Sequence, residues 1–373
     1  MTTVEPIILE FSNITKSIEA KRGLKLHNKA NSPICLIKEK VYHYFHNNTT
    51  IGFKTFDNLN EVVTTENNFD LLLISSNHPS RSKSDTYYLT PDTVLRTHTS
   101  AHQNELLRSG ERHFLVTGDV YRKDEIDRFH YPVFHQMEGV HIVDDNTDPE
   151  TDLKLVLAGL VEFLFPNKQY RFNSDYFPFT HPSFEVEVLL GEKWVEILGC
   201  GVVQPKILEH NGLTKKAWAF GLGLERLAII LYSIPDIRLF WTDDEKFTSQ
   251  FSNHSCLDDI TFVAYPKIPA ITKDISFWLP TDEVDEVDGK GIWRNVNDFF
   301  DVVRNCLDTS VEKLDLIDTF FHPKRKQRSH CWRLTLSPNL NVTDPGEFNE
   351  ACNAQMLALR DDLVNKLKLE VRG

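Results

Sequence analysis

Two arginines occur in contexts suited to binding a polyphosphate. Arg122 ends a strand-like segment and begins a polar loop, and Arg226 lies on an apolar, helix-like segment that follows Gly221-Leu222-Gly223. A guanidinium binds phosphate oxygens through two parallel hydrogen bonds and stays charged, while glycines allow a ligand to approach the backbone closely. A surface ion pair is the plainer interpretation of either arginine alone, and a tight turn that of a Gly-Leu-Gly sequence. The prediction of a phosphate site therefore depends on their combination.

Three side chains of the segment after this loop point the same way if the segment is a strand, because strand side chains alternate. Phe134, Gln136 and Glu138 share one face, and His135 and Met137 share the other. The aromatic ring can stack on a base, and the amide and carboxylate can receive an ammonium group. This face suits an amino acid beside a nucleotide. An amphipathic strand with a solvated polar face is the alternative.

Two more clusters carry side chains that can bind a small ligand. The segment Thr97-His98-Thr99-Ser100-Ala101-His102-Gln103 is dense in hydrogen-bonding groups, although a helix start capped by Thr99 or Ser100 explains the same residues. Phe177 and Phe179 share one side of an extended segment and can grip a flat apolar ligand. Two core aromatics are the alternative for that pair.

The elements that must position these residues follow from sequence patterns. Ser32-Pro33 predicts a helix start, with apolar residues at helical spacing from 34 to 45. Strand-like stretches dominate residues 69–241, among them a hairpin over 184–198 that turns at 191–193. An apolar helix over 224–232 ends before Pro235. Consecutive strands joined by loops, with few crossover helices, favour a mostly antiparallel sheet.

The last part of the sequence is typical of a separate unit that follows a boundary near residues 252–266. The patterns predict, in order, a strand at 271–279, a helix at 296–307, strands near 314–317 and 331–336, a helix that begins at Asp344-Pro345, and a strand at 369–371. This β-α-β-β-α-β order is that of the ferredoxin-like fold. The predicted fold class is α+β, with one domain at 1–260 and a ferredoxin-like domain at 261–373.

The composition of the 373 residues is that of a globular protein, with 41% hydrophobic and 25% charged residues. A formal net charge of −13 argues against a general nucleic-acid coat protein, so any nucleic-acid contact must come from local basic patches. The six cysteines show no metal-ligand spacing, which favours free thiols in a reducing compartment. No apolar run reaches the roughly 18–20 residues of a membrane span, and neither a signal peptide nor a transit peptide is visible.

Taken together, the motifs resemble those of the class II aminoacyl-tRNA synthetases, and most closely the monomeric, mitochondrial-type phenylalanine–tRNA ligases. The likeness runs from near residue 25 to the C-terminus. Each motif alone has weak or moderate specificity, whereas all of them in this order are highly specific. The motifs are Leu95-Arg96-Thr97-His98-Thr99-Ser100-Ala101-His102-Gln103, Gly118-Asp119-Val120-Tyr121-Arg122, Phe134-His135-Gln136-Met137-Glu138-Gly139, Phe177-Pro178-Phe179-Thr180-His181-Pro182-Ser183, Trp194-Val195-Glu196-Ile197-Leu198-Gly199-Cys200-Gly201, Ala219-Phe220-Gly221-Leu222-Gly223-Leu224-Glu225-Arg226-Leu227 and Ile234-Pro235-Asp236-Ile237-Arg238.

The resemblance implies a catalytic domain on an antiparallel sheet (1–260, with an N-terminal helical extension) and an anticodon-binding domain (261–373). It implies that ATP and L-phenylalanine form phenylalanyl-adenylate and pyrophosphate, with Mg²⁺ as cofactor. The acyl group then passes to the 3′-terminal ribose of tRNA(Phe). It also implies a monomer that serves organellar translation in the mitochondrial matrix, with no membrane contact.

The resemblance also assigns roles to individual residues. Arg122 would bridge the α-phosphate and the amino-acid carboxylate, and Arg226 would bind the γ-phosphate; these two are the predicted catalytic residues. Phe134 would stack on adenine, and Glu196 is a candidate Mg²⁺ ligand. Ala219 would leave a small floor beneath the para position of phenylalanine. The predicted substrate-binding residues are His98, Ser100, Ala101, His102, Gln103, Arg122, Phe129, His130, Tyr131, Phe134, Gln136, Met137, Glu138, Phe177, Phe179, Glu196, Ala219, Phe220, Gly221, Gly223 and Arg226.

A basic tip between two predicted strands of the second domain is the candidate tRNA contact. It can meet anticodon-arm phosphates, and His322, His330 and Trp332 are near enough in the sequence to stack a base. A solvated hairpin turn is the alternative. The predicted tRNA-binding residues are Lys324, Arg325, Lys326 and Arg328.

Two rival functions compete with the phenylalanine ligase. The first is a class II ligase for another amino acid, against which the slot of Phe177, Phe179 and Ala219 argues. The second is a catalytically silent paralogue that acts as an RNA-binding or regulatory protein, against which intact Arg122, Glu138 and Arg226 argue.

Overall fold

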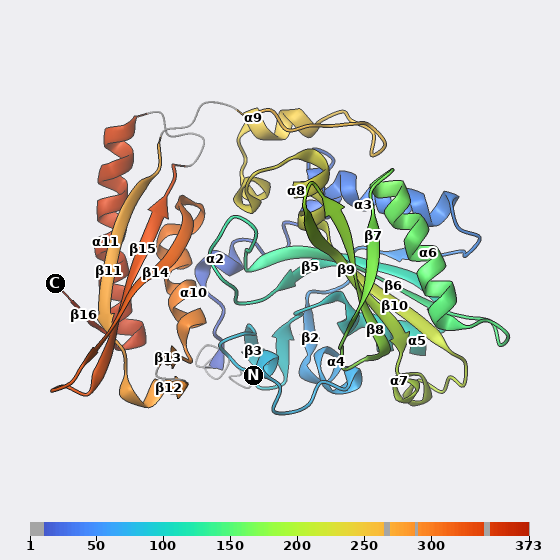
Figure 1. The fold of residues 1–373 in the computed structure, drawn as a ribbon, viewed down its shortest axis with the longest axis horizontal. Coiled ribbons are helices and arrows are strands. Elements are labelled where there is room, and N and C mark those ends of the chain that lie inside the picture. The colour runs from blue at the N-terminus through green and yellow to red at the C-terminus, as the bar shows by residue number, and fades with distance from the viewer. Residues whose placement is uncertain (1–10, 265–268, 288–289, 339–343, 373) are drawn as a thin grey trace, which may run out of the picture.

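The chain forms two β-sheet units, each with its own apolar core, that lie side by side (Figure 1). The computed structural model describes residues 11–264, 269–287, 290–338 and 344–372. No helix within these ranges is long and apolar enough to cross a membrane.

The larger sheet has seven strands in the order β1-β5-β6-β10-β9-β8-β7. All neighbouring strands are antiparallel except β1 and β5, which are parallel. The prediction of a mostly antiparallel sheet is confirmed, and so is the hairpin, which β8 and β9 form. The strands are β1 (Lys54–Phe56), β5 (His113–Tyr121), β6 (Val133–Ile142), β7 (Tyr170–Asp175), β8 (Thr180–Leu190), β9 (Lys193–Val203) and β10 (Ala217–Gly223).

Three helices pack with this sheet to form the largest core: α3 (Pro33–Asn47), α6 (Pro149–Leu164) and α8 (Leu224–Tyr232). Ser32 caps α3 as predicted, because its Oγ accepts a hydrogen bond from the Ile34 amide at 3.2 Å. The boundaries of α8 agree with the predicted helix over 224–232. The sequence patterns did not predict α6, which Asp148 caps.

A small three-stranded sheet, β2-β4-β3, precedes the segment Thr97–Gln103 in the chain. That segment forms a short 3-10 helix, Thr99–His102, which leads into α5. Neither Thr99 nor Ser100 caps it, since His98 precedes the helix and makes no side-chain cap. The remaining elements of this unit are α2 (Lys16–Glu19), β2 (Val62–Thr64), α4 (Thr65–Asn68), β3 (Tyr88–Thr90), β4 (Thr93–Leu95), α5 (Gln103–Arg108), α7 (Pro205–His210) and α9 (Glu245–Thr248).

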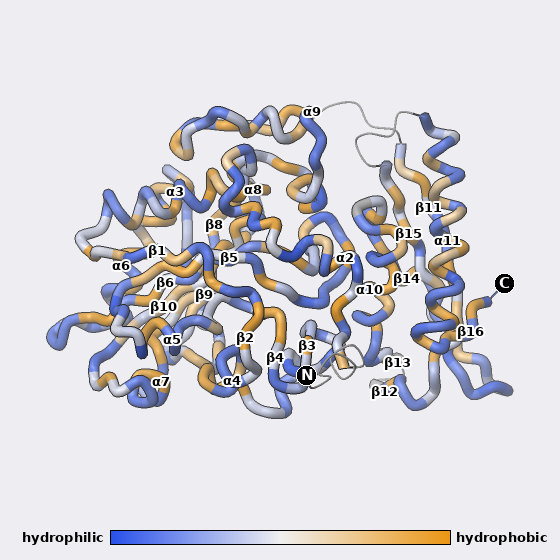
Figure 2. Tube along the Cα trace, turned by 180° about the vertical axis from the view of Figure 1, so that it is seen from behind, coloured by the Kyte–Doolittle hydropathy of each residue, from blue (hydrophilic) through white to orange (hydrophobic). Residues whose placement is uncertain are grey.

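The C-terminal unit has a four-stranded sheet in the order β14-β15-β11-β16, with helices α10 and α11 packed against each other. Hydrophilic and hydrophobic residues are mixed along α11 (Figure 2), and Phe348, Cys352, Met356, Leu359 and Leu363 of this helix lie in the core. A hairpin of β12 and β13, absent from the predicted order, is inserted before α10. The elements are β11 (Ile271–Trp278), β12 (Val284–Val287), β13 (Lys290–Trp293), α10 (Val296–Leu307), β14 (Val311–His322), β15 (Gln327–Leu336), α11 (Pro345–Leu367) and β16 (Glu370–Val371).

The loop between β5 and β6 joins the two units. Lys123 reaches Asp298 of α10 at 2.7 Å, and Arg304 Nη2 donates to the Asp124 carbonyl at 2.5 Å. Ile126 belongs to the apolar core of the C-terminal unit. This loop follows Arg122, so the C-terminal unit helps to shape one wall of the cleft described next.

Candidate active site

Two adjoining cavities open on the larger sheet, with volumes of about 320 and about 290 Å³. Four residues line both of them: Arg122, Gln136, Glu196 and Gly221. The first cavity also has an aromatic wall, and the second is bordered by the β5–β6 loop and the start of α8. Two ligands, or two parts of one ligand, can therefore meet at Arg122.

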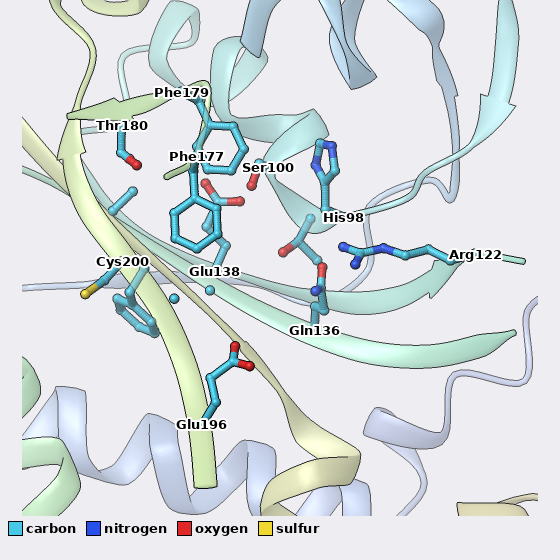
Figure 3. A pocket seen from close by; sticks show the side chains of 15 residues that line it. His98, Ser100, Arg122, Gln136, Glu138, Phe177, Phe179, Thr180, Glu196 and Cys200 are labelled. Carbon is cyan, nitrogen blue, oxygen red and sulfur yellow. The ribbon is translucent and has the colours of Figure 1, made fainter. Parts of the chain in front are cut away.

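Arg122 extends into the cleft from the end of β5, opposite the two aromatic rings of the first cavity (Figure 3). Its Nε donates to the Thr97 carbonyl at 2.6 Å, and its guanidinium lies 5.5 Å from the centre of the Phe134 ring. No other side-chain hydrogen bond of Arg122 is found among the described residues. The two terminal nitrogens are thus left for an anionic ligand.

Arg226 is held more loosely than Arg122. Its Nη1 donates to the Glu196 carboxylate at 3.1 Å and to the Glu196 carbonyl at 3.2 Å. Both side chains of this ion pair are about half exposed, at 46% and 47%. An exposed ion pair contributes little stability, so a phosphate group can replace the carboxylate at low cost.

Glu138 is buried on the same face of β6 as Gln136, and neither of its carboxylate oxygens has a hydrogen-bond partner among the described residues. Burial raises the pKa of Glu138 to about 8, and the nearby Ser100 hydroxyl opposes that shift. His98 is also without a partner at either ring nitrogen. Burial, helped by the positive charge of Arg122, lowers the pKa of His98 to about 3, which keeps the ring neutral.

Phe177 and Phe179 stand side by side in the first cavity (Figure 3), with ring centres 5.9 Å apart and planes 11° from parallel. A Cβ at Gly199 would lie 2.8 Å from Phe177 Cζ, so only glycine leaves room for this ring. Ala219 lines the same cavity. Together these residues leave a flat apolar slot beside the polar groups of Glu138 and Gln136.

The structure brings most of the predicted substrate-binding residues together. The first cavity contains His98, Ser100, Arg122, Gln136, Glu138, Phe177, Phe179, Glu196, Ala219, Phe220 and Gly221. The second contains Arg122, Phe129, His130, Tyr131, Phe134, Gln136, Glu196, Gly221, Gly223 and Arg226.

Four predicted residues line neither cavity, and a role for them in substrate binding stays a prediction. Met137 lies in the main core because strand alternation turns it away from Gln136 and Glu138. Ala101 packs in a smaller apolar cluster. His102 contacts Arg96 and Glu105 instead of the cavity, and Gln103 is buried at the start of α5.

The sequence interpretation missed Glu225, which lines the second cavity and joins two elements of the site. Both oxygens of Glu225, on α8, take hydrogen bonds from His135, on β6: one from the backbone amide at 2.8 Å and one involving ring Nδ1 at 2.6 Å. This contact ties the strand with Phe134 to the helix with Arg226. The acidic residue directly before Arg226, together with a histidine on the strand that carries Phe134, is the signal that could have indicated it.

The predicted basic tip lies at the turn between β14 and β15, where Lys324, Arg325 and Lys326 are exposed. Arg325 also pairs with Glu370 at 2.7 Å. Arg328 is half-buried, 5.5 Å from the centre of the Phe321 ring.

The aromatic residues near this tip differ from those predicted. Trp332 lies in the core of the C-terminal unit and His330 is buried, so neither can stack a base from solvent. Phe320 and Phe321 on β14 are the exposed aromatics instead, at 42% and 47%.

Comparison with known proteins agrees with this geometry. A family described as "tRNA synthetases class II core domain (F)" matches residues 17–251. A relative from Arabidopsis thaliana, named "Phenylalanine--tRNA ligase, chloroplastic/mitochondrial", is 45% identical over 97% of this chain and 83% of its own length. A Mus musculus relative named "Phenylalanine--tRNA ligase, mitochondrial" is 43% identical over 92% and 83%. One of the same name from Dictyostelium discoideum is 40% identical over 98% and 90%.

The chain is therefore a member of the class II aminoacyl-tRNA synthetases. The matched range includes the seven-stranded sheet and the residues that line both cavities. Within that class it belongs to the phenylalanine–tRNA ligases of the mitochondrial type, and it is an ATP-dependent ligase. This confirms the recognition made from the motifs.

Proposed function

We propose that the two cavities bind phenylalanine and ATP, with Arg122 bridging the α-phosphate and the amino-acid carboxylate. The observation that carries this proposal is the sharing of Arg122 by both cavities. Arg226 binds the γ-phosphate at the far part of the second cavity, where it exchanges Glu196 for the phosphate. Phe134 stacks on adenine, and Phe129 closes over the nucleotide from the β5–β6 loop.

Phenylalanine enters the first cavity with its ring against Phe177 and Phe179 and its ammonium group near Glu138 and Gln136. The unpaired Glu138 carboxylate supports this orientation, because a buried acid without a partner gains most from an incoming cation. Ala219 lies under the para position and leaves no polar partner for a tyrosine hydroxyl.

The chemistry requires position and charge stabilisation more than a protein base. A carboxylate oxygen of phenylalanine attacks the α-phosphorus, the bond to the bridging oxygen breaks, and pyrophosphate leaves with that electron pair. Holding the carboxylate in line can supply roughly 7–11 kcal/mol of the barrier. Arg122 and Arg226 stabilise the charge that develops on the phosphates. The terminal ribose of the tRNA then attacks the acyl carbon and releases AMP.

Glu196 fits the role of a Mg²⁺ ligand. Mg²⁺ on ATP is usually bound through one or two carboxylates together with phosphate oxygens. Glu196 lines the second cavity and is half exposed, whereas both oxygens of Glu225 are occupied by His135. When bound there, the ion would neutralise phosphate charge.

The C-terminal unit is proposed to be a ferredoxin-like anticodon-binding domain. Its element order and strand order support this assignment. Lys324, Arg325, Lys326 and Arg328 contact the anticodon arm of tRNA(Phe), and Phe320 and Phe321 offer exposed rings to its bases. The domains divide near residue 260; because Phe262 still packs in the first core, the linker begins after it. We further propose a monomer in the mitochondrial matrix.

ATP–pyrophosphate exchange measured with each of the twenty amino acids tests this function. Exchange that depends on phenylalanine alone is expected. Exchange with another amino acid would indicate a different ligase, and no exchange with any would indicate a silent paralogue.

A further inference from the structure

Asn68 lines neither cavity, yet its side chain is fully buried and fully hydrogen-bonded at the end of α4. Its Nδ2 donates to Thr97 Oγ1 at 2.9 Å, and its Oδ1 accepts from the Thr97 backbone amide at 3.0 Å. Two hydrogen bonds between one side-chain amide and one residue fix both the position and the rotation of that residue. Asn68 therefore controls how the Thr97 peptide is turned.

The Thr97 carbonyl is the group that accepts the Nε hydrogen of Arg122, at 2.6 Å. Thr97 is itself buried, so water does not offer Arg122 an alternative acceptor there. With Nε fixed, the planar guanidinium has one orientation and its terminal nitrogens face the cavities. Arg226 has no such buried support, because its partner Glu196 is half exposed.

We propose that Asn68 is a positioning residue for adenylate formation, which acts by holding the Thr97 carbonyl against Nε of Arg122. This inference rests on the proposed role of Arg122 at the α-phosphate. Asn68 itself lines neither cavity. Its side chain reaches Arg122 through Thr97, whereas its backbone, which a change of side chain keeps, lies beside His98 of the first cavity. A shift of the guanidinium by about 1 Å can cost about a hundredfold in rate.

The test is a double-mutant cycle in phenylalanine-dependent pyrophosphate exchange, with Asn68→Ala, Arg122→Lys and the double variant. Asn68→Ala is expected to lower kcat about 10- to 100-fold and to change the KM for phenylalanine less than about threefold. In the Arg122→Lys background, Asn68→Ala should lower kcat less than about threefold, because the guanidinium that Asn68 helps to restrain is absent. Equal losses in both backgrounds would overturn the proposal.

Asn104 provides a matched control. It is fully buried, its Nδ2 donates to the Leu71 carbonyl at 3.3 Å, and its Oδ1 accepts from Asn211 at 2.6 Å. Asn104→Ala should lower the melting temperature, because it removes the hydrogen bonds of a buried amide, and kcat should stay within about threefold of the wild type. A kcat loss as large as that of Asn68→Ala would mean that any buried asparagine has this effect, and would refute the specific role.

Thr97 gives a second pair of variants in case Asn68→Ala fails to fold. Thr97→Val removes only the hydroxyl and should lower kcat about fivefold, as the loss of one hydrogen bond implies, whereas Thr97→Ser should behave as wild type. Wild-type kcat for Thr97→Val would overturn the proposal. Pyrophosphate exchange at the wild-type rate by Arg122→Lys would instead contradict the role of Arg122. If Arg122→Lys lowers the exchange rate and Asn68→Ala does not, only the inference on Asn68 is refuted.

Discussion

At the level of single residues, the cleft is marked by polar groups that lack partners. Among the described residues, neither Glu138, near the Ser100 hydroxyl, nor His98, near the Asn68 backbone, makes a hydrogen bond of good geometry, and Arg122 uses only Nε. Buried polar groups in folded proteins are normally paired, and unpaired ones gather at functional sites. An amino acid and a triphosphate supply the ammonium, carboxylate and phosphate groups that would pair them.

Binding of phenylalanine near neutral pH should release a proton from Glu138. The pKa of Glu138 in the free protein is raised to about 8 by burial, so at pH 7 the group is mostly protonated. An ammonium group favours the ionised form, so binding should expel close to one proton at pH 7 and none well above pH 8. Calorimetric titration in buffers of different ionisation enthalpy measures this number. Glu138→Gln should release none; release by that variant would point to another group.

Ala219→Gly should admit phenylalanine analogues with a substituent at the para position. Ala219 lines the first cavity beside the aromatic rings, and removing its methyl group enlarges the floor of the slot. Pyrophosphate exchange with para-chloro- and para-bromophenylalanine is expected to rise at least about tenfold relative to the wild type. An unchanged analogue profile would place the para position elsewhere in the cavity.

At the level of elements, the site depends on the contact between β6 and α8. Glu225 takes two hydrogen bonds from His135, and both side chains are buried. This contact fixes the strand that carries Phe134 relative to the helix that carries Arg226. The contact thus aligns two walls of the second cavity, which Glu225 itself also lines.

Glu225→Ala should destabilise the fold and weaken ATP binding together. It leaves the buried His135 amide and ring unpaired, at a cost of about 1–3 kcal/mol for each orphaned group. Urea unfolding should show this loss, and the KM for ATP in pyrophosphate exchange should rise more than the KM for phenylalanine. Glu209→Ala, at an exposed position on α7, should change the free energy of unfolding by no more than about 0.5 kcal/mol. It should leave the KM for ATP unchanged. A stable Glu225→Ala variant with normal KM for ATP would refute this role.

Elements with a strong local signal were predictable from the sequence. Ser32-Pro33 marked the start of α3, and the apolar run from Leu224 to Tyr232 marked α8. The β12–β13 hairpin was not predicted, because its strands are short, at four residues each, and are exposed in part. Short strands carry too little periodicity to separate from loops.

The site was predictable where residues alternate along one strand, as Phe134, Gln136 and Glu138 do. The Asn68–Thr97 and His135–Glu225 contacts that support the site were not predictable, because each joins residues far apart in the sequence. Asn68 meets Thr97 across 29 positions, and His135 meets Glu225 across 90. No local pattern reports such a pairing. Trp332 was misassigned for the related reason that burial in a sheet core depends on which helices cover it.

At the level of the whole molecule, a chain with a net charge of −13 must bind an anionic tRNA through a local surface. The β14–β15 turn concentrates exposed Lys324, Arg325 and Lys326 at the end of the C-terminal unit. Phosphate contacts of this kind weaken as salt rises. The same unit contacts the β5–β6 loop at Lys123 and Asp124, and this loop borders the second cavity.

Charge reversal at the turn should separate the two half-reactions. Lys324→Glu with Lys326→Glu is expected to lower aminoacylation of tRNA at least about tenfold. Pyrophosphate exchange should stay within about twofold, because no residue of the turn lines either cavity. Lys29→Glu with Lys168→Glu, at exposed positions of the larger unit, introduces the same charge change as a control. Equal loss of both reactions at the turn would argue against a role in tRNA binding.

The central claim is that Arg122 and Arg226 act on one triphosphate beside a slot for phenylalanine. Phenylalanine-dependent pyrophosphate exchange by Arg122→Ala tests it most directly, with thermal unfolding to verify the fold. Since loss of one group that stabilises transition-state charge costs about 100- to 1,000-fold, a loss of at least that size is predicted for a folded variant. Exchange near the wild-type rate by folded Arg122→Ala would contradict the account.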